Sequence, residues 1–182
     1  TKRKKKALEL YKINRVYVFI CQINDLIIRT NQRQELFQEI CNIAVHFGKF
    51  RMSWIGLLAE NTNVIQTAAF AGFENDYFKS SIITSSANDP GGKGPTGIAV
   101  RGGKTVICND IANDPRMKPW KEEALERGYR SVIAIPIVVR YKIIGSFNLY
   151  SNEINFFSSE EEILLLEKII LNLSFALEGI LI

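Results

Sequence analysis

Apolar residues at helical spacing occupy both ends of this 182-residue chain. Near the amino end they recur at steps of three and four residues, at Ile13, Val16, Ile20, Ile23 and Ile27. Near the carboxyl end the same steps run through Ile163, Leu166, Ile170, Leu173, Leu177 and Ile180. Such a seam is typical of a helix that packs against another helix. Ser158 and Ser159, each followed three residues later by a glutamate, form a capping-box pattern at the start of the second helix.

The two seams allow two interpretations, packing on the chain's own sheet or packing on a second chain. The carboxyl-terminal helix carries further apolar residues outside its seam, among them Leu164, Leu171 and Phe175. That is more apolar surface than one narrow interface needs. We therefore expect one helix face on the domain and the seam on a partner helix.

Between the two ends the apolar period changes to that of strands. Residues 52–59 and 64–71 are rich in β-formers and are joined by a polar turn, which predicts a hairpin. A second hairpin is predicted over residues 131–139 and 143–150, and a short strand over 105–109. An amphipathic helix is expected over residues 32–47, with Thr30 or Asn31 as its cap and Gly48 at its end. Short helical pieces are expected near residues 75–81, 96–101 and 119–127.

This order of elements predicts an α+β fold with a central, largely antiparallel sheet. The terminal helices would cover one face of the sheet, and loops and short helices would cover a pocket on the other face. We divide the chain into a signalling and dimerisation helix (residues 1–30), a sensory core (31–157) and a carboxyl-terminal helix (158–182). The last helix is expected to lead to an output domain beyond the sequence.

The composition excludes several classes of protein. With 47% hydrophobic and 23% charged residues the chain is globular, and no uncharged apolar stretch reaches the length of a membrane helix. Three scattered cysteines and the lack of a secretion signal predict a cytoplasmic location. The net charge of +4 owes much to the first six residues, and no basic and aromatic stripe follows them. We therefore expect no nucleic-acid or membrane contact.

Few side chains offer catalytic or metal-binding chemistry. His46 is the only histidine, which excludes most multi-histidine metal sites. Cys108 lies in no motif that would lower the pKa of its thiol. The glycine-rich residues 97–105 lack the spacing of a phosphate-binding loop and precede a strand rather than a helix. Among the acidic residues of the middle segment, Asp110 is a stronger candidate for a functional role than Asp89 or Asp114. It comes directly after a short strand and beside the loop-rich middle segment.

The middle of the chain resembles the GAF domain family. The resemblance is carried by GPTGIAVRGGK at residues 94–104, VICNDI at 106–111, DPRM at 114–117, PW at 119–120 and GYRSVIAIPI at 128–137. It covers roughly residues 12–182 and is greatest to GAF modules of bacterial sensor histidine kinases and cyclic-di-GMP signalling proteins. The resemblance implies a pocket opposite the terminal helices, pairing of two copies through those helices, and relay of a signal along them.

The residues that define several ligand-binding and enzymatic classes of this family are absent from this sequence. No adjacent cysteine and histidine could tether a bilin, and the Asn-Lys-Phe-Asp-Glu signature of cyclic-nucleotide binders is absent. Residues 98–100 read Ile-Ala-Val, without the cysteine expected of a free methionine sulfoxide reductase. We predict no cofactor, no metal and no catalytic residue. The alternatives are a thiol enzyme using Cys108 and a dimerisation spacer without a ligand.

The leading interpretation is a sensory domain that binds an unidentified small molecule. Candidate pocket residues are Trp54, Phe70, Thr96, Asp110, Trp120, Tyr129, Ser131 and Phe147. For each aromatic residue ordinary core packing is the alternative, and Thr96 and Ser131 could instead cap or turn the chain. Candidate residues of a homodimer interface are Ile13, Val16, Ile20, Ile23, Ile27, Ile163, Leu166, Ile170, Leu173 and Leu177.

Overall fold

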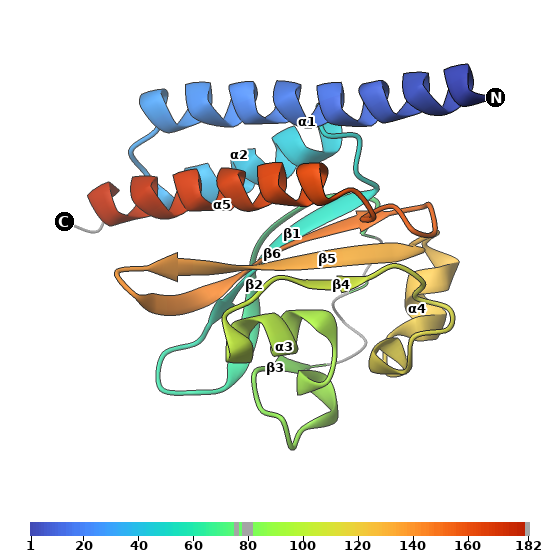
Figure 1. Ribbon diagram of the computed structural model, residues 1–182. Coiled ribbons are helices and arrows are strands. Elements are labelled where there is room, and N and C mark those ends of the chain that lie inside the picture. The colour runs from blue at the N-terminus through green and yellow to red at the C-terminus, as the bar shows by residue number, and fades with distance from the viewer. Residues whose placement is uncertain (75–76, 78–81, 181–182) are drawn as a thin grey trace.

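A computed structural model describes residues 1–74, 77 and 82–180 of the chain (Figure 1). Its helices are α1 (Lys2–Arg29), α2 (Arg33–His46), α3 (Pro95–Gly102), α4 (Lys121–Glu126) and α5 (Glu160–Ile180). Its strands are β1 (Met52–Leu58), β2 (Val64–Gly72), β3 (Ile83–Thr84), β4 (Val106–Cys108), β5 (Ser131–Val139) and β6 (Lys142–Ser151). The 3₁₀ turns η2 (Pro90–Gly92) and η3 (Pro115–Met117) lie in the middle segment. The helical piece predicted near residues 75–81 falls, apart from Tyr77, outside the described residues.

The described strands form one sheet in the order β3-β2-β1-β6-β5-β4, with every neighbouring pair antiparallel. Helix α2 packs on β1 and β2, and α5 packs on β5, so both lie on one face of the sheet. Helix α1 lies outside them and packs on both, while α3 and α4 lie on the opposite side of the sheet (Figure 1). The predicted α+β architecture is confirmed.

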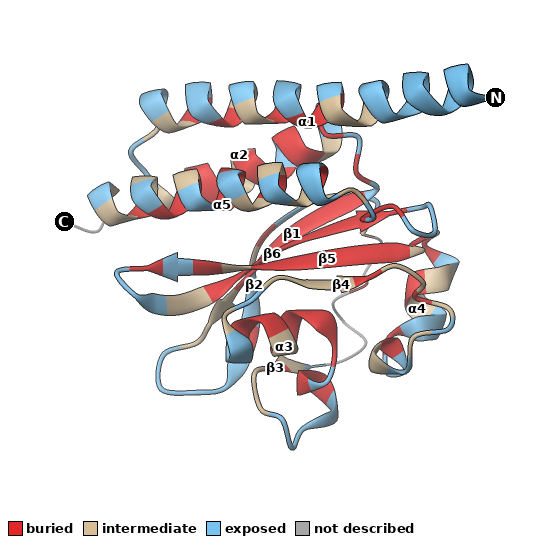
Figure 2. Cartoon of the chain, viewed as in Figure 1, coloured by how far each residue is buried: buried red, intermediate tan, exposed pale blue. Residues whose placement is uncertain are grey.

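The helix-covered face holds the larger hydrophobic core. Six of the ten predicted seam residues are at most 3% exposed within this single chain: Val16, Ile23, Leu166, Ile170, Leu173 and Leu177. The other four, Ile13, Ile20, Ile27 and Ile163, are half-buried beside them. Figure 2 shows the buried stripe of α1 and α5 turned toward the sheet and their exposed sides turned outward. In this chain the seams therefore join α1, α2, α5 and the sheet to one another.

Charged and polar groups fix the terminal helices in place. The guanidinium of Arg15 on α1 donates to Glu162 Oε1 in the first turn of α5, at 2.6 Å. The same guanidinium donates to the carbonyl of Gly48 and lies over the rings of Phe50 and Phe156. Both partners are buried, Arg15 at 6% and Glu162 at 1% exposure. This ion pair connects two residues that are 147 positions apart in the sequence. Together with the contact of Arg15 to Gly48, it joins the start of α5 to α1 and to the residues just after α2.

The local signals of the sequence are largely confirmed. Glu162 N donates to Ser159 Oγ at 3.3 Å, so Ser159 caps α5 as the capping pattern predicts. The β5–β6 hairpin closes on a two-residue turn in which Arg140 and Tyr141 both have positive φ, as a tight antiparallel hairpin requires. The predicted cap of α2 was wrong, because Gln32 occupies that position and its side chain makes no capping hydrogen bond. Strand β3 was not predicted.

Candidate functional site

The candidate pocket lies on the sheet face opposite α1, α2 and α5. A second buried cluster covers this face, and its members are Met52, Trp54, Ile65, Tyr77, Val100, Cys108, Ile111, Met117, Trp120, Ala124, Tyr129, Val132 and Tyr150. Side chains alternate between the two faces of a strand. Trp54 therefore points to this cluster, while its neighbour Ile55 belongs to the core beneath the helices.

A small cavity lies within this cluster, between α3, η3 and β6. Its volume is about 10 Å³, and its lining is Tyr77, Ile83, Gly94, Pro95, Thr96, Gly97, Met117, Trp120 and Tyr150. That volume is close to what one water molecule needs. Of the predicted pocket residues, Thr96 and Trp120 line the cavity. The described lining carries no charged side chain, so it suits an uncharged group.

A buried hydrogen-bond network ties the cavity wall to the centre of the sheet. Thr96 Oγ1 on α3 donates to Asn148 Oδ1 at 2.8 Å, and Ser146 Oγ donates to the same oxygen at 3.1 Å. Asn148 Nδ2 donates to the carbonyl of Trp54 on β1 at 3.2 Å. Ser146 and Asn148 are both fully buried. Asn148 is thus a central site residue that the sequence interpretation missed.

Among the residues that the structure describes, Trp120 and Asp110 each have a buried polar atom near this cluster without a hydrogen-bond partner. Trp120 is 5% exposed, and its indole Nε1 donor is unpaired. A buried donor left unpaired costs free energy, so such an atom calls for a water or a ligand acceptor. Asp110 Oδ1 is also buried and unpaired, whereas Asp110 Oδ2 accepts from Asn113. Asp110 does not line the cavity.

Tyr129 and Ser131 have structural contacts instead of lining the cavity. The hydroxyl of Tyr129 donates to the carbonyl of Phe73. The centroid of the Tyr129 ring lies 5.2 Å from that of the Tyr77 ring and 4.8 Å from that of the Tyr150 ring. Burial raises the pKa of Tyr129 well above its usual value. Ser131 Oγ donates to the carbonyl of Glu153 at 2.7 Å and so anchors the loop that follows β6.

Neither Phe147 nor Phe70 lines the cavity. Phe147 pairs with Ile55 and lies in the core beneath the helices, because alternation along β6 gives the pocket face to Asn148. Phe147 therefore belongs to the opposite face of the sheet, which corrects its assignment to the pocket. Phe70 pairs with Trp54 but is 45% exposed and lies outside the buried cluster. Trp54 is fully buried and supplies its carbonyl to Asn148.

Comparison with known families decides which fold family this arrangement represents. A family model described as the GAF domain matches residues 30–178. The chain belongs to the GAF domain family. No curated protein matches the sequence. The predicted family is therefore confirmed over most of the chain, including the cavity and the network around Asn148.

Solved structures similar to this GAF domain have different functions. One is the free methionine-R-sulfoxide reductase of Neisseria meningitidis with its substrate: TM-score 0.74 and 18% identity, covering 90% of this chain and 88% of that chain. The GAF domain of a Coxiella burnetii phosphoenolpyruvate-protein phosphotransferase has TM-score 0.72, 14% identity and 90% and 93% coverage. The A. aeolicus nlh2 GAF domain has TM-score 0.66, 17% identity and 96% and 97% coverage. At these identities the likeness shows the fold alone.

The cysteines of this GAF domain occupy three separate environments. Cys21 is exposed on α1, Cys41 is buried beneath the helices, and Cys108 is buried on the pocket face. Burial, and then the hydrogen bond to Asp114, raise the pKa of Cys108 to about 12. Its thiol is therefore protonated and weakly nucleophilic near neutral pH. Cys108 does not line the cavity, and no group of potential metal ligands occurs among the described residues.

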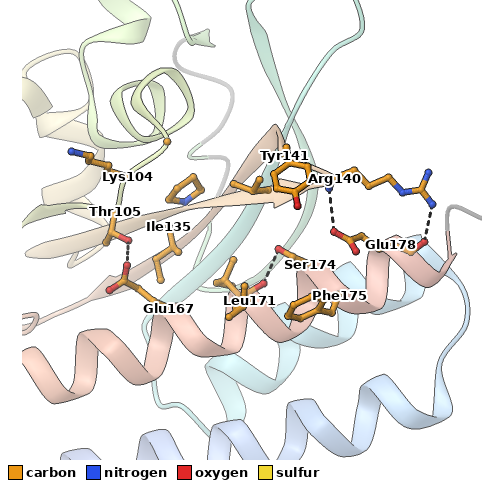
Figure 3. A pocket seen from close by; sticks show the side chains of 14 residues that line it. Lys104, Thr105, Ile135, Arg140, Tyr141, Glu167, Leu171, Ser174, Phe175 and Glu178 are labelled. Carbon is orange, nitrogen blue, oxygen red and sulfur yellow. Dashed lines mark hydrogen bonds between the residues drawn. The ribbon is translucent and has the colours of Figure 1, made fainter.

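A much larger open groove lies on the helix side of the GAF domain, between α5 and the β4–β5 edge of the sheet. Its volume is about 850 Å³. Figure 3 shows Glu167, Leu171, Phe175 and Glu178 of α5 facing Thr105 and the β5–β6 turn. Thr105 Oγ1 donates to Glu167 at 2.9 Å, and Arg140 N donates to Glu178 at 3.2 Å. None of the predicted pocket residues lies in this groove.

Among the helices that the structure describes, none combines the length and the apolar composition that a membrane span requires.

Proposed function

We propose that this GAF domain is the sensory module of a bacterial signal-transduction protein, of the sensor histidine kinase or cyclic-di-GMP signalling type. It binds a small, uncharged molecule beside Thr96 and Trp120 and relays the bound state to the terminal helices. The observation that carries the proposal is the buried, unpaired indole donor of Trp120, a residue that lines the cavity together with Thr96, which donates to Asn148. A ligand acceptor would satisfy this donor.

The cavity is chemically suited to binding more than to catalysis. Its described lining offers aromatic and apolar surface with a few polar groups, which is typical of a small-molecule site. Because its present volume fits about one water, a larger ligand has to shift α3 or η3 relative to the sheet. Such a shift would change the hydrogen bond from Thr96 to Asn148, and the ligand would thereby favour one conformation over another.

A connection from the cavity to the terminal helices supports the relay. Asn148 lies on β6, and only eight residues separate the end of β6 from the start of α5. At its other end, the β5–β6 turn contacts the end of α5 through Arg140 and Glu178. Both ends of α5 are therefore linked to the strand that bears Asn148. A packed helix passes a small displacement along its length, because packed interfaces have discrete arrangements.

Native mass spectrometry of the purified chain tests the proposal, followed by identification of the small molecules released on denaturation. We expect a bound molecule, and we expect Trp120→Phe to lose it, because this change removes the indole donor and keeps an aromatic ring. Tyr129→Phe is the matched control: it removes a polar hydrogen from an aromatic residue of the same cluster that does not line the cavity. A chain that carries no molecule, and that no metabolite mixture stabilises against heat, would favour a spacer without a ligand.

The thiol-enzyme alternative has its own test. Reduction of free methionine sulfoxide by the purified chain is assayed with a dithiol reductant, beside a Cys108→Ser variant. We expect no turnover in either, because the Cys108 thiol is buried and protonated. Turnover that disappears in Cys108→Ser would replace the binding module by an enzyme.

A further inference from the structure

The open groove between α5 and the β4–β5 edge lies where the helix layer of the domain ends. Helix α2 packs on β1 and β2, and α5 packs on β5. The sheet continues one strand further, to β4, which packs against α3 on the opposite face. We call the open space beside α5, with its volume of about 850 Å³, the α5 groove. One more helix in this groove would extend the helix layer to the edge of the sheet.

The α5 wall of the groove is an apolar stripe with a carboxylate at each end (Figure 3). Steps of four, three and four residues separate Glu167, Leu171, Ser174 and Glu178, which places them on one side of the helix. Phe175 lies beside Ser174 and also lines the groove. Leu171 and Phe175 are 55% and 63% exposed, so the chain leaves much of their apolar surface uncovered. The two glutamates are eleven residues apart, which is about three helical turns, or ~16 Å.

The two carboxylates of this wall have hydrogen-bond donors but no cationic partner among the described residues. Glu167 accepts from Thr105 Oγ1 at 2.9 Å, and Glu178 accepts from the backbone N–H of Arg140 at 3.2 Å. The guanidinium of Arg140 donates to the backbone carbonyl of Glu178 instead of its carboxylate. Neither glutamate belongs to an ion pair within the described chain. The exposed Lys104 is turned away from α5 in Figure 3. Both carboxylates can therefore accept from cations that a partner supplies.

The other wall of the groove favours a helix over an added strand. Strand β4 pairs only with residues 132–134 of β5, so the edge of β5 is free over residues 135–139. Pro136 lies in this free stretch and has no N–H to donate to another strand. The register against β6 also shifts between Ile137 and Val138. Proline and irregular register are common means by which sheet edges avoid taking up further strands.

We infer that the α5 groove binds an amphipathic helix of another protein, about three turns long, with a Lys or Arg residue at each end of its apolar stripe. Cations eleven positions apart on that helix would face Glu167 and Glu178. Apolar residues three, four and seven positions after the first cation would meet Leu171 and Phe175. A helix about 10 Å across, half sunk over ~16 Å, covers roughly 250 Å². That is well below the ~800 Å² per partner of a standard interface and indicates transient docking.

The helices of this chain do not offer the complementary pattern. Among its described helices, basic residues eleven positions apart occur at Lys4 and Arg15 of α1. Arg15 is 6% exposed and is paired with Glu162. A different protein therefore fits the α5 groove better than a second copy of this chain. This docking goes beyond the proposed function and does not depend on a molecule bound beside Trp120.

Fluorescence anisotropy of the full chain with a labelled fifteen-residue peptide tests the docking. The peptide has lysine at its second and thirteenth positions, leucine at its fifth, sixth and ninth, and alanine or glutamine elsewhere. We expect saturable binding that is about tenfold weaker in Glu167→Gln/Glu178→Gln, because both charged contacts become neutral. Phe175→Gln should weaken binding at least tenfold, because it removes an aromatic anchor. Glu160→Gln and Leu164→Gln are the matched controls, since they make the same changes at exposed sites of α5 outside the groove.

A second peptide and a second measurement define the results that would overturn the inference. The second peptide has the same composition, with its leucines moved to the side opposite the lysines, and we expect it to bind at least tenfold more weakly. Equal binding of both peptides, or binding that no groove variant weakens, would contradict docking in the α5 groove. Sedimentation equilibrium without peptide tests the other occupant. Self-association that Phe175→Gln abolishes and Leu164→Gln retains, together with no peptide binding, would assign the groove to a second copy. Each of these results leaves small-molecule binding at Trp120 open to its own test.

Discussion

The two faces of the sheet are closed by different kinds of interaction. Beneath the helices, long apolar side chains from α1, α2 and α5 fill the core, and one buried ion pair joins the helices. On the pocket face, short elements are held by hydrogen bonds such as Thr96 to Asn148 and by close approach at glycines. It is on this pocket face, too, that the indole donor of Trp120 is buried without a partner.

This difference separates stability from function. Apolar packing on the helix face contributes free energy in proportion to buried area and tolerates no empty space. The pocket face combines its own buried apolar cluster with a few directional contacts, such as Thr96 to Asn148, and these can be exchanged for contacts with a ligand at small cost. The proposed sensory function would use both properties, a rigid helix layer to transmit a shift and a surface whose hydrogen bonds can rearrange.

The largest expected effect concerns the ion pair of the helix face. Arg15→Met leaves Glu162 buried without a partner, which should cost about 3–5 kcal/mol of unfolding free energy. The double variant Arg15→Met/Glu162→Leu removes both charges and should recover most of that loss, because desolvation of the pair offsets much of its attraction. Urea unfolding of the three proteins measures both values. A single variant as stable as the wild type would show that water reaches this pair.

Helix α3 of the pocket face offers the next comparison within one element. A methyl group on Gly97 would lie less than 3.0 Å from the carbonyl oxygens of Thr84 and Gly92. Backbone atoms cannot yield as a flexible side chain does, so Gly97→Ala should cost about 1–3 kcal/mol. Gly102 in the same helix has no atom within 4 Å of that position, so Gly102→Ala should be neutral or gain up to about 1 kcal/mol. Thermal unfolding compares the two, and equal midpoints would mean that α3 moves freely away from Thr84.

Much of the fold follows from local pattern, and the exceptions share a physical cause. The predicted strand over residues 131–139 coincides with β5, because its apolar pattern and flanking turns are local signals. Strand β3 has only Ile83 and Thr84, and it exists through pairing with β2, which a local pattern does not contain. Six of the ten predicted seam residues are at most 3% exposed within the single chain, whereas their assignment to a partner helix stays a prediction. Spacing alone did not identify what covers them, because one stripe can face a sheet, a helix of the same chain or a partner.

The site was predicted less completely than the fold, because it depends on which strands become neighbours. Trp54 and Asn148 face the same side only through the pairing of β1 with β6, which joins residues 94 positions apart. Because the sequence alone does not give that register, Phe147 was assigned to the pocket and Asn148 was missed. A signal existed in β6, where Ser146 and Asn148 alternate with apolar neighbours in a buried strand. Thr96 and Trp120, which the sequence proposed from the middle of the chain, do line the cavity, and their role in binding a ligand stays a prediction.

A carboxylate on the pocket face gives a pH-dependent comparison. Hydrogen bonding to Arg116 is the main cause that lowers the pKa of Asp114 from 3.8 to about 2. Because the folded pKa lies below the unfolded one, this stabilisation is fully present above about pH 4 and is lost as pH falls through about 2. With the side chain 17% exposed, we expect Asp114→Asn to be about 1–2 kcal/mol less stable than wild type near pH 5. The two unfolding free energies should converge near pH 2, and a constant difference would contradict the assignment.

The smallest expected effect tests the start of α5 on the helix face. Ser159 Oγ accepts from Glu162 N, whereas the neighbouring Ser158 is exposed. Ser159→Ala should therefore cost about 1 kcal/mol, the usual contribution of an N-cap side chain. Ser158→Ala should change the unfolding free energy by less than about 0.5 kcal/mol. Because Glu162 gives its carboxylate to Arg15 and its amide to Ser159, the cap also orients the buried ion pair. Combined with Arg15→Met, the loss from Ser159→Ala should shrink, and strict additivity in a double-mutant cycle would show that cap and ion pair act independently.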